Sequence, residues 1–167
     1  GQAFFAAQTY TGTTTITGGS LEFDGAIASS AISLSTGNVV FYTANSGSRT
    51  VSSNISGSGA VSLSGFLSTY TFTGNNTYSG GTRFENTSVV LGSSNALGTG
   101  SISLQGKIGL TYTAQNTVDY SGRIGLVTNS ILTVDTGGQN VTWAGAPFTG
   151  LVGNALIKNG AGTLVLN

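Results

Sequence analysis

The sequence predicts an all-β solenoid of roughly eight coils with almost no helix. Three observations support this: short segments alternate apolar and polar residues, glycine-rich turns separate them, and one turn-and-strand pattern recurs. Apolar residues two apart place one face of a strand in a core. The 167 residues are enough for one continuous core. We divide them into an N-terminal apolar extension, residues 1–8, and a single solenoid domain, residues 9–167.

The alternating segments follow one another along the whole chain. In order they are TTTIT (13–17), SLEFD (20–24), AISLS (31–35), NVVFYT (38–43), GAVSLS (59–64), TYTFT (69–73), SVVLG (88–92), SISLQ (101–105), ILTVD (131–135), NVTW (140–143) and TLVLN (163–167). Between them lie glycine pairs and G-x-G segments, which are typical of turns. No stretch of ten or more residues has apolar positions at helical spacing.

Repetition favours a solenoid over a sandwich or a barrel, which also contain many short strands. A G-x-G turn followed by an alternating strand occurs in NISGSGAVSLSG (54–65), NALGTGSISLQG (95–106) and ALIKNGAGTLVLN (155–167). About 20 residues per coil is typical of short solenoid repeats and gives the estimate of eight coils. We expect these side chains to point inward: Val61, Leu63, Val90, Ile102, Leu104, Ile131, Val134, Leu164 and Leu166.

Three segments identify a family resemblance. GNNTYSGGT (74–82), NALGTGSISL (95–104) and LIKNGAGTLVLN (156–167) resemble the passenger-associated transport repeat, also called the autotransporter-associated β-strand repeat, of autotransporter passenger domains. The resemblance implies a right-handed parallel β-helix on a secreted, cell-surface protein of a Gram-negative-type bacterium. Residues 107–150 follow the repeat only loosely.

The composition excludes several kinds of site. Without histidine or cysteine, catalytic triads and imidazole or thiolate metal sites are impossible, and we expect no catalytic, cofactor or metal site. Only 6% of residues are charged and the net charge is zero, so nucleic acid and anionic membranes are poor partners. The apolar run AFFAA is far shorter than the ~20 residues that span a bilayer, so we expect no membrane insertion of this segment.

Two groups of side chains leave alternatives open. Glu22 and Asp24 lie two apart and would suit a glycosidase pair or a cation site, but we expect both to face solvent opposite buried Leu21 and Phe23. A polysaccharide-cleaving enzyme remains the least favoured function. The aromatic residues could form a sugar-binding surface stripe, but we expect them to fill core corners. They are Tyr42, Tyr70, Phe72, Tyr78, Tyr112, Tyr120 and Trp143.

The two ends of the chain suggest self-assembly. TYTGTTTITGGSLEF (9–23) resembles the second half of the family repeat, and LIKNGAGTLVLN resembles its first half. Either the chain is a slice of a longer array, acting as an adhesin or stalk that contacts glycans or cell-surface proteins, or separate subunits stack head to tail into a filament. We favour the filament, with AFFAAQTY (3–10) docking on the neighbour as an added strand. The expected interface comprises Phe4, Phe5, Tyr10, Ile16, Leu164, Val165 and Leu166.

Overall fold

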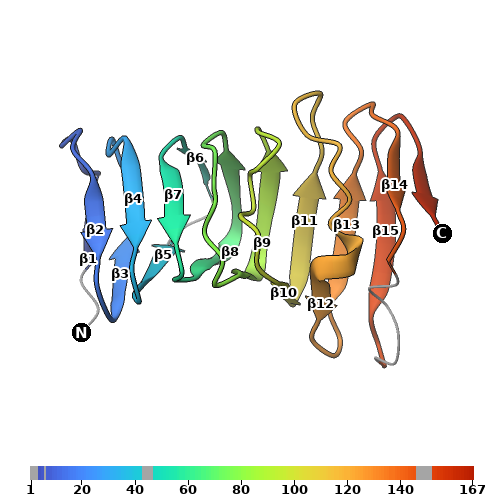
Figure 1. Cartoon of the computed structure of the whole chain (residues 1–167). Helices are drawn as coiled ribbons and strands as arrows, with labels where there is room; N and C mark the ends of the chain where they lie inside the picture. Colours follow the sequence, from blue (N-terminus) through green and yellow to red (C-terminus); the bar gives the residue numbers. More distant parts are fainter. Residues whose placement is uncertain (1–3, 6, 43–46, 146–151) are drawn as a thin grey trace.

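The computed structural model describes residues 4–5, 7–42, 47–145 and 152–167. It is a parallel β-solenoid of about seven turns, with the N-terminal strands at one end and the C-terminal strands at the other (Figure 1). All pairings between named strands are parallel. The all-β prediction is therefore confirmed. The helical content of the described residues is one 3-10 turn, η1 (Ser121–Arg123).

Each coil passes through three stacks of strands. Stack one holds β2 (Thr14–Ile16), β4 (Ala31–Leu34), β7 (Asn54–Gly57), β14 (Val141–Trp143) and β16 (Leu164–Leu166). Stack two holds β1 (Phe4–Phe5), β3 (Ser20–Phe23), β5 (Asn38–Tyr42), the first halves of β8 (Val61–Phe72) and β9 (Thr82–Leu91), β10 (Ile102–Gln105) and β12 (Ile124–Leu126). Stack three holds β6 (Ser48–Val51), the second halves of β8 and β9, β11 (Lys107–Thr111), β13 (Ile131–Asp135) and β15 (Ala155–Asn159).

The length of the coils explains why there are about seven turns rather than eight. Paired residues lie 18 positions apart between β3 and β5, from Ser20 to Asn38. They lie 24 positions apart between β13 and β15, from Ile131 to Ala155. Later coils are longer because wider loops join their strands, so the chain completes fewer turns than a uniform 20-residue repeat predicts.

The core runs along the axis and is built from inward side chains of all three stacks. The predicted inward positions Val61, Leu63, Ile102, Leu104 and Val134 are buried. Two predictions were wrong, because Val90 and Ile131 are only partly buried while their neighbours Val89 and Leu132 point inward. Leu132 lies in register with Ile108 and Val134 with Leu110, so the register of the stack sets the inward face.

Most of the large aromatic side chains lie inside the solenoid, as predicted. Tyr42 is only partly buried; the buried ones are Tyr70, Phe72, Tyr78, Tyr112, Tyr120 and Trp143. The indole Nε1 of Trp143 donates a hydrogen bond to the Tyr112 hydroxyl at 2.9 Å, which links two coils inside the core. Burial raises the pKa of Tyr112, so its hydroxyl stays protonated and can donate to the carbonyl oxygen of Val118, 3.1 Å away.

Asp119 joins two successive coils at the surface. Its carboxylate accepts hydrogen bonds from the Ser121 hydroxyl at 2.6 Å, from the Ser121 N–H at 2.8 Å and from the Ala144 N–H at 2.8 Å. Partial burial opposes ionisation, but these hydrogen bonds outweigh it and lower the pKa of Asp119. The ionised form therefore stabilises the folded chain.

We expect an Asp119→Asn substitution to destabilise the protein at pH 7 and to matter less in acid. Because the folded pKa is lowered, the stabilising contribution is present above the unfolded pKa of ~3.9 and is lost as pH falls through the folded value. Urea unfolding of both proteins at pH 7 and pH 3 measures this. The explanation fails if the difference in free energy of unfolding is the same at both pH values.

Candidate assembly interface

The C-terminal end of the solenoid is an uncovered rung. β15 ends the largest sheet and β16 ends the pair that it forms with β14. Leu164 lies in register with the buried Val141, and Leu166 with the buried Trp143. Leu164 is only partly buried and Leu166 is 56% exposed. The predicted inward direction of both residues therefore agrees with the register, but no further coil among the described residues covers them.

The N-terminal end is also an edge. β2 ends its three-stranded sheet, with Thr14 and Ile16 on its buried face. Tyr10 is 42% exposed, and its hydroxyl lies 2.6 Å from Thr14 Oγ1. The same hydrogen bond joins Tyr78 to Thr82 inside the solenoid, where both residues are buried. Tyr10 thus makes the same contact as the buried Tyr78, but at an end of the solenoid that no described residue covers.

The N-terminal extension of the sequence prediction belongs in part to the coil. The backbone of Phe4 and Phe5 pairs with Glu22 and Phe23, and Gln8 forms a bridge with Ile27. The described part of AFFAAQTY therefore lies on the first coil of its own chain. The side chains of Phe4 and Phe5, two members of the expected interface, lie outside the described part of the structure.

The strand order at the two ends is complementary. Each coil visits stack one, then stack two, then stack three; the chain begins in stack two with β1 and ends in stack one with β16. Continuing the register of β14 and β16 into a second copy would place its Thr14 on Leu164 and its Ile16 on Leu166.

The three G-x-G turns of the repeated sequence pattern do not all occupy the same corner of the coil. Gly57–Gly59 and Gly98–Gly100 lead into strands of stack two, whereas Gly160–Gly162 leads into β16 of stack one. The sequence similarity of the two chain ends to one repeat therefore does not give their position in the coil. The order of the strands and the uncovered rung are the stronger indications.

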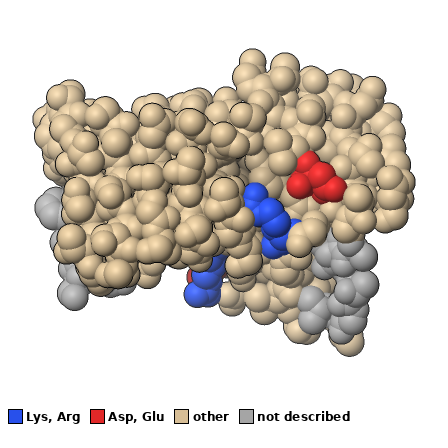
Figure 2. Space-filling model, in the orientation of Figure 1, with Lys and Arg blue, Asp and Glu red and all other residues tan. Residues whose placement is uncertain are grey.

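The carboxylates do not gather in one place. Figure 2 shows charged side chains as a few isolated patches on an otherwise uncharged face. Two of the carboxylates form ion pairs: Asp24 Oδ1 lies 3.6 Å from Arg49 Nη2, and Glu85 Oε2 lies 3.4 Å from Arg83 Nη2. Glu22 was expected to face solvent, but it is only 5% exposed, and Leu21 is partly rather than fully buried. In the described part of the chain, no three His, Cys, Asp or Glu residues lie close enough together to hold a metal ion.

The fold places this protein in the class of parallel β-solenoids. The chain matches no family model, no curated protein and no solved structure. No helix among the described residues is long and apolar enough to cross a membrane. Inference about function therefore rests on the geometry of the coil.

Sequence reasoning missed one prominent surface feature. Phe66 and Leu67 are 73% and 65% exposed and lie at a register shift within β8. The sequence contained a signal for this feature. The apolar residues of this strand are odd-numbered at first, at Val61 and Leu63, and even-numbered later, at Tyr70 and Phe72, and burial follows the same change. Such a change of phase marks a bulge, which re-aims side chains.

Proposed function

We propose that this chain is a non-enzymatic structural protein whose coils stack head to tail into an extracellular filament, on a cell surface or in a matrix. The observation that supports this most is the C-terminal rung, where Leu164 and Leu166 occupy core positions that no coil of the described residues covers. Terminal coils of solenoids need polar caps, because an open rung exposes both apolar core and unpaired strand edges. The last strand of this chain, LVL, carries no polar side chain.

The occupant of this rung is a second copy of the same chain. Its β2 would add to β16 in parallel, and its Ile16 would lie on Leu166. Each contact joins the C-terminal face of one molecule to the N-terminal face of the next, and such a heterologous contact does not close on itself. The low charge suits this arrangement, because stacked rungs place equivalent side chains about 4.8 Å apart and a repeated charge would face itself.

Electron microscopy and sedimentation velocity of the purified chain test the proposal. Filaments one solenoid wide, growing with protein concentration at neutral pH, are expected. A monodisperse monomer at high concentration would exclude the filament.

The second candidate is a segment of a longer autotransporter-like passenger that acts as a stalk or adhesin. The resemblance of GNNTYSGGT and NALGTGSISL to the autotransporter passenger repeat favours it, and further coils of the same chain would then cover the open rung. Both candidates place the protein outside a Gram-negative-type cell. The intact mass of the natively purified protein separates them, because a mass well above 16.7 kDa favours the longer passenger.

A further inference from the structure

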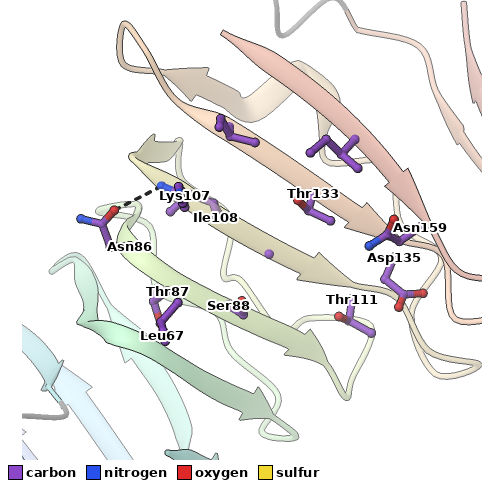
Figure 3. Close-up of a pocket in the computed structure, with 13 residues that line it drawn as sticks. Leu67, Asn86, Thr87, Ser88, Lys107, Ile108, Thr111, Thr133, Asp135 and Asn159 are labelled. Atoms are coloured by element: carbon purple, nitrogen blue, oxygen red, sulfur yellow. Dashed lines mark hydrogen bonds between the residues drawn. The ribbon is translucent and has the colours of Figure 1, made fainter. Parts of the chain in front are cut away.

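A shallow groove of about 510 Å³ runs across the outer face of stack three. Its floor consists of outward-facing side chains on β9, β11, β13 and β15, and the sticks in Figure 3 follow one another from strand to strand across this face. Register pairing places Ser88, Gly109, Thr133 and Ile157 in one line across four rungs. Because the groove crosses the rungs, a linear ligand would lie along the solenoid axis.

The floor offers both polar and apolar contacts at the rung spacing. Beside the first line, Thr111, Asp135 and Asn159 form a second one, with hydroxyl, carboxylate and amide groups that can bond to hydroxyl groups. Gly109 keeps the floor flat, because a Cβ there would overlap Ser88 Oγ. A ligand could therefore lie close to the strands.

One rim of the groove projects two large apolar side chains into solvent. Leu67 lines the groove, and Phe66 lines a second hollow of about 360 Å³. The two hollows share four lining residues, Leu67, Asn86, Lys107 and Ile131. Leu67 has φ = +59°, a conformation that costs free energy for any residue with a Cβ and is unusual for a leucine. Its side chain is 65% exposed, so little core packing offsets that cost.

Positive φ recurs along this rim, where successive coils turn from stack two into stack three. Three non-glycine residues there have positive φ, namely Leu67, Asn86 and Asn129, and all three line the two joined hollows. The side chain of Asn86 accepts a hydrogen bond from the Lys107 N–H at 3.2 Å, drawn in Figure 3. Glycines occupy the same corner in other coils, with φ = +81° at Gly106 and +78° at Gly153, and asparagine tolerates positive φ, so the turn itself accounts for Asn86 and Asn129. Leucine does not tolerate this conformation, so the exposed Leu67 is the strained residue of the rim.

The charges of the groove balance. Its lining contains one cation, Lys107, and one anion, Asp135, so a strongly charged ligand of either sign finds no excess of opposite charge. The groove lies on the face of a sheet rather than at its edge, which excludes a peptide that adds as a strand. Apolar platforms beside hydroxyl-binding groups suit sugar rings, which have C–H faces and hydroxyl edges.

We propose that this groove binds a linear, uncharged oligosaccharide, with Phe66 and Leu67 packing on sugar rings and the polar side chains of the floor bonding to hydroxyl groups. The site lies on the lateral face, so binding does not depend on self-assembly. The retention of a strained, exposed leucine is then explained by its contact with the ligand.

Calorimetric titration at protein concentrations where the chain is monomeric tests the site. The probes are cellohexaose, laminarihexaose, maltohexaose, mannohexaose and chitohexaose, with hexagalacturonate as the acidic comparison. At least one uncharged hexasaccharide is expected to bind, and hexagalacturonate is not. Phe66→Ala is expected to weaken that binding at least tenfold, whereas Val118→Ala, a change at another exposed apolar residue outside both hollows, leaves it unchanged.

Leu67→Asn separates function from structure. Asparagine tolerates positive φ, so this variant is expected to bind more weakly yet to melt about 3 °C higher. The proposal is overturned if no uncharged hexasaccharide binds at 10 mM, if only hexagalacturonate or a random peptide pool binds, or if Phe66→Ala binds as tightly as the parent. Failure of the chain to form filaments would not affect these outcomes.

Discussion

Replacing Leu166 with lysine is expected to weaken end-to-end assembly roughly 100-fold while the coil itself still folds. Leu166 is 56% exposed in the single chain, so the charge is solvated before assembly. In the filament the same side chain would lie in the core between two copies, where an unpaired charge costs several kcal/mol. A loss of about 3 kcal/mol lowers the association constant roughly 100-fold. Sedimentation velocity across a concentration series measures this change.

The matched control for this experiment is Val118→Lys. Val118 is 40% exposed but lies on a loop between β11 and η1, away from both ends of the coil. This variant is expected to assemble as the parent does. If Leu166→Lys forms filaments at the parental concentration, the contact between copies does not use the open rung, and the head-to-tail arrangement is wrong.

Gly59→Ala is expected to destabilise the coil by about 3 kcal/mol. Gly59 is buried in the corner between stacks one and two. A Cβ there would overlap the carbonyl oxygen of Gly37 and lie 2.8 Å from the Cβ of Leu34. These atoms belong to the coil below. Because the carbonyl group of Gly37 is backbone and cannot rotate away, the two coils would have to move apart. Urea unfolding followed by circular dichroism gives the free energy.

Gly18→Ala provides the comparison for Gly59→Ala. Gly18 lies in the turn between β2 and β3, the first turn of the same corner, and a Cβ there would meet nothing within 4 Å. We expect the free energy of unfolding to change by less than about 1 kcal/mol, since alanine restricts the unfolded chain without a clash. Equal effects of the two substitutions would show that close contact between coils does not explain the glycine turns.

Much of the fold could be predicted from the sequence because alternation is unambiguous in many strands. In AVSLS the apolar residues Val61 and Leu63 alternate with Ser62 and Ser64, so only one face can be buried. Where both faces of a strand carry apolar residues, alternation does not show which face points into the core. ILTVD offers Ile131 on one face and Leu132 on the other, and only the pairing of Leu132 with Ile108 sets the direction.

The sites were harder to predict than the fold, because they depend on which coils lie side by side. The groove joins Ser88, Gly109, Thr133 and Ile157, which are 21 to 24 residues apart in the sequence and adjacent only through the register. The burial of Glu22 could not be predicted either, since its alternation places it on the outward face of β3.

The central claim is that copies of this chain stack along the solenoid axis. Cryo-electron microscopy of the assembled protein tests it most directly. With about seven turns per molecule and a rung spacing of ~4.8 Å, stacked copies should repeat every ~34 Å along the fibre, with strands perpendicular to the axis. Fibres whose molecules contact one another through lateral faces, with strands along the axis or no repeat near this length, would contradict it.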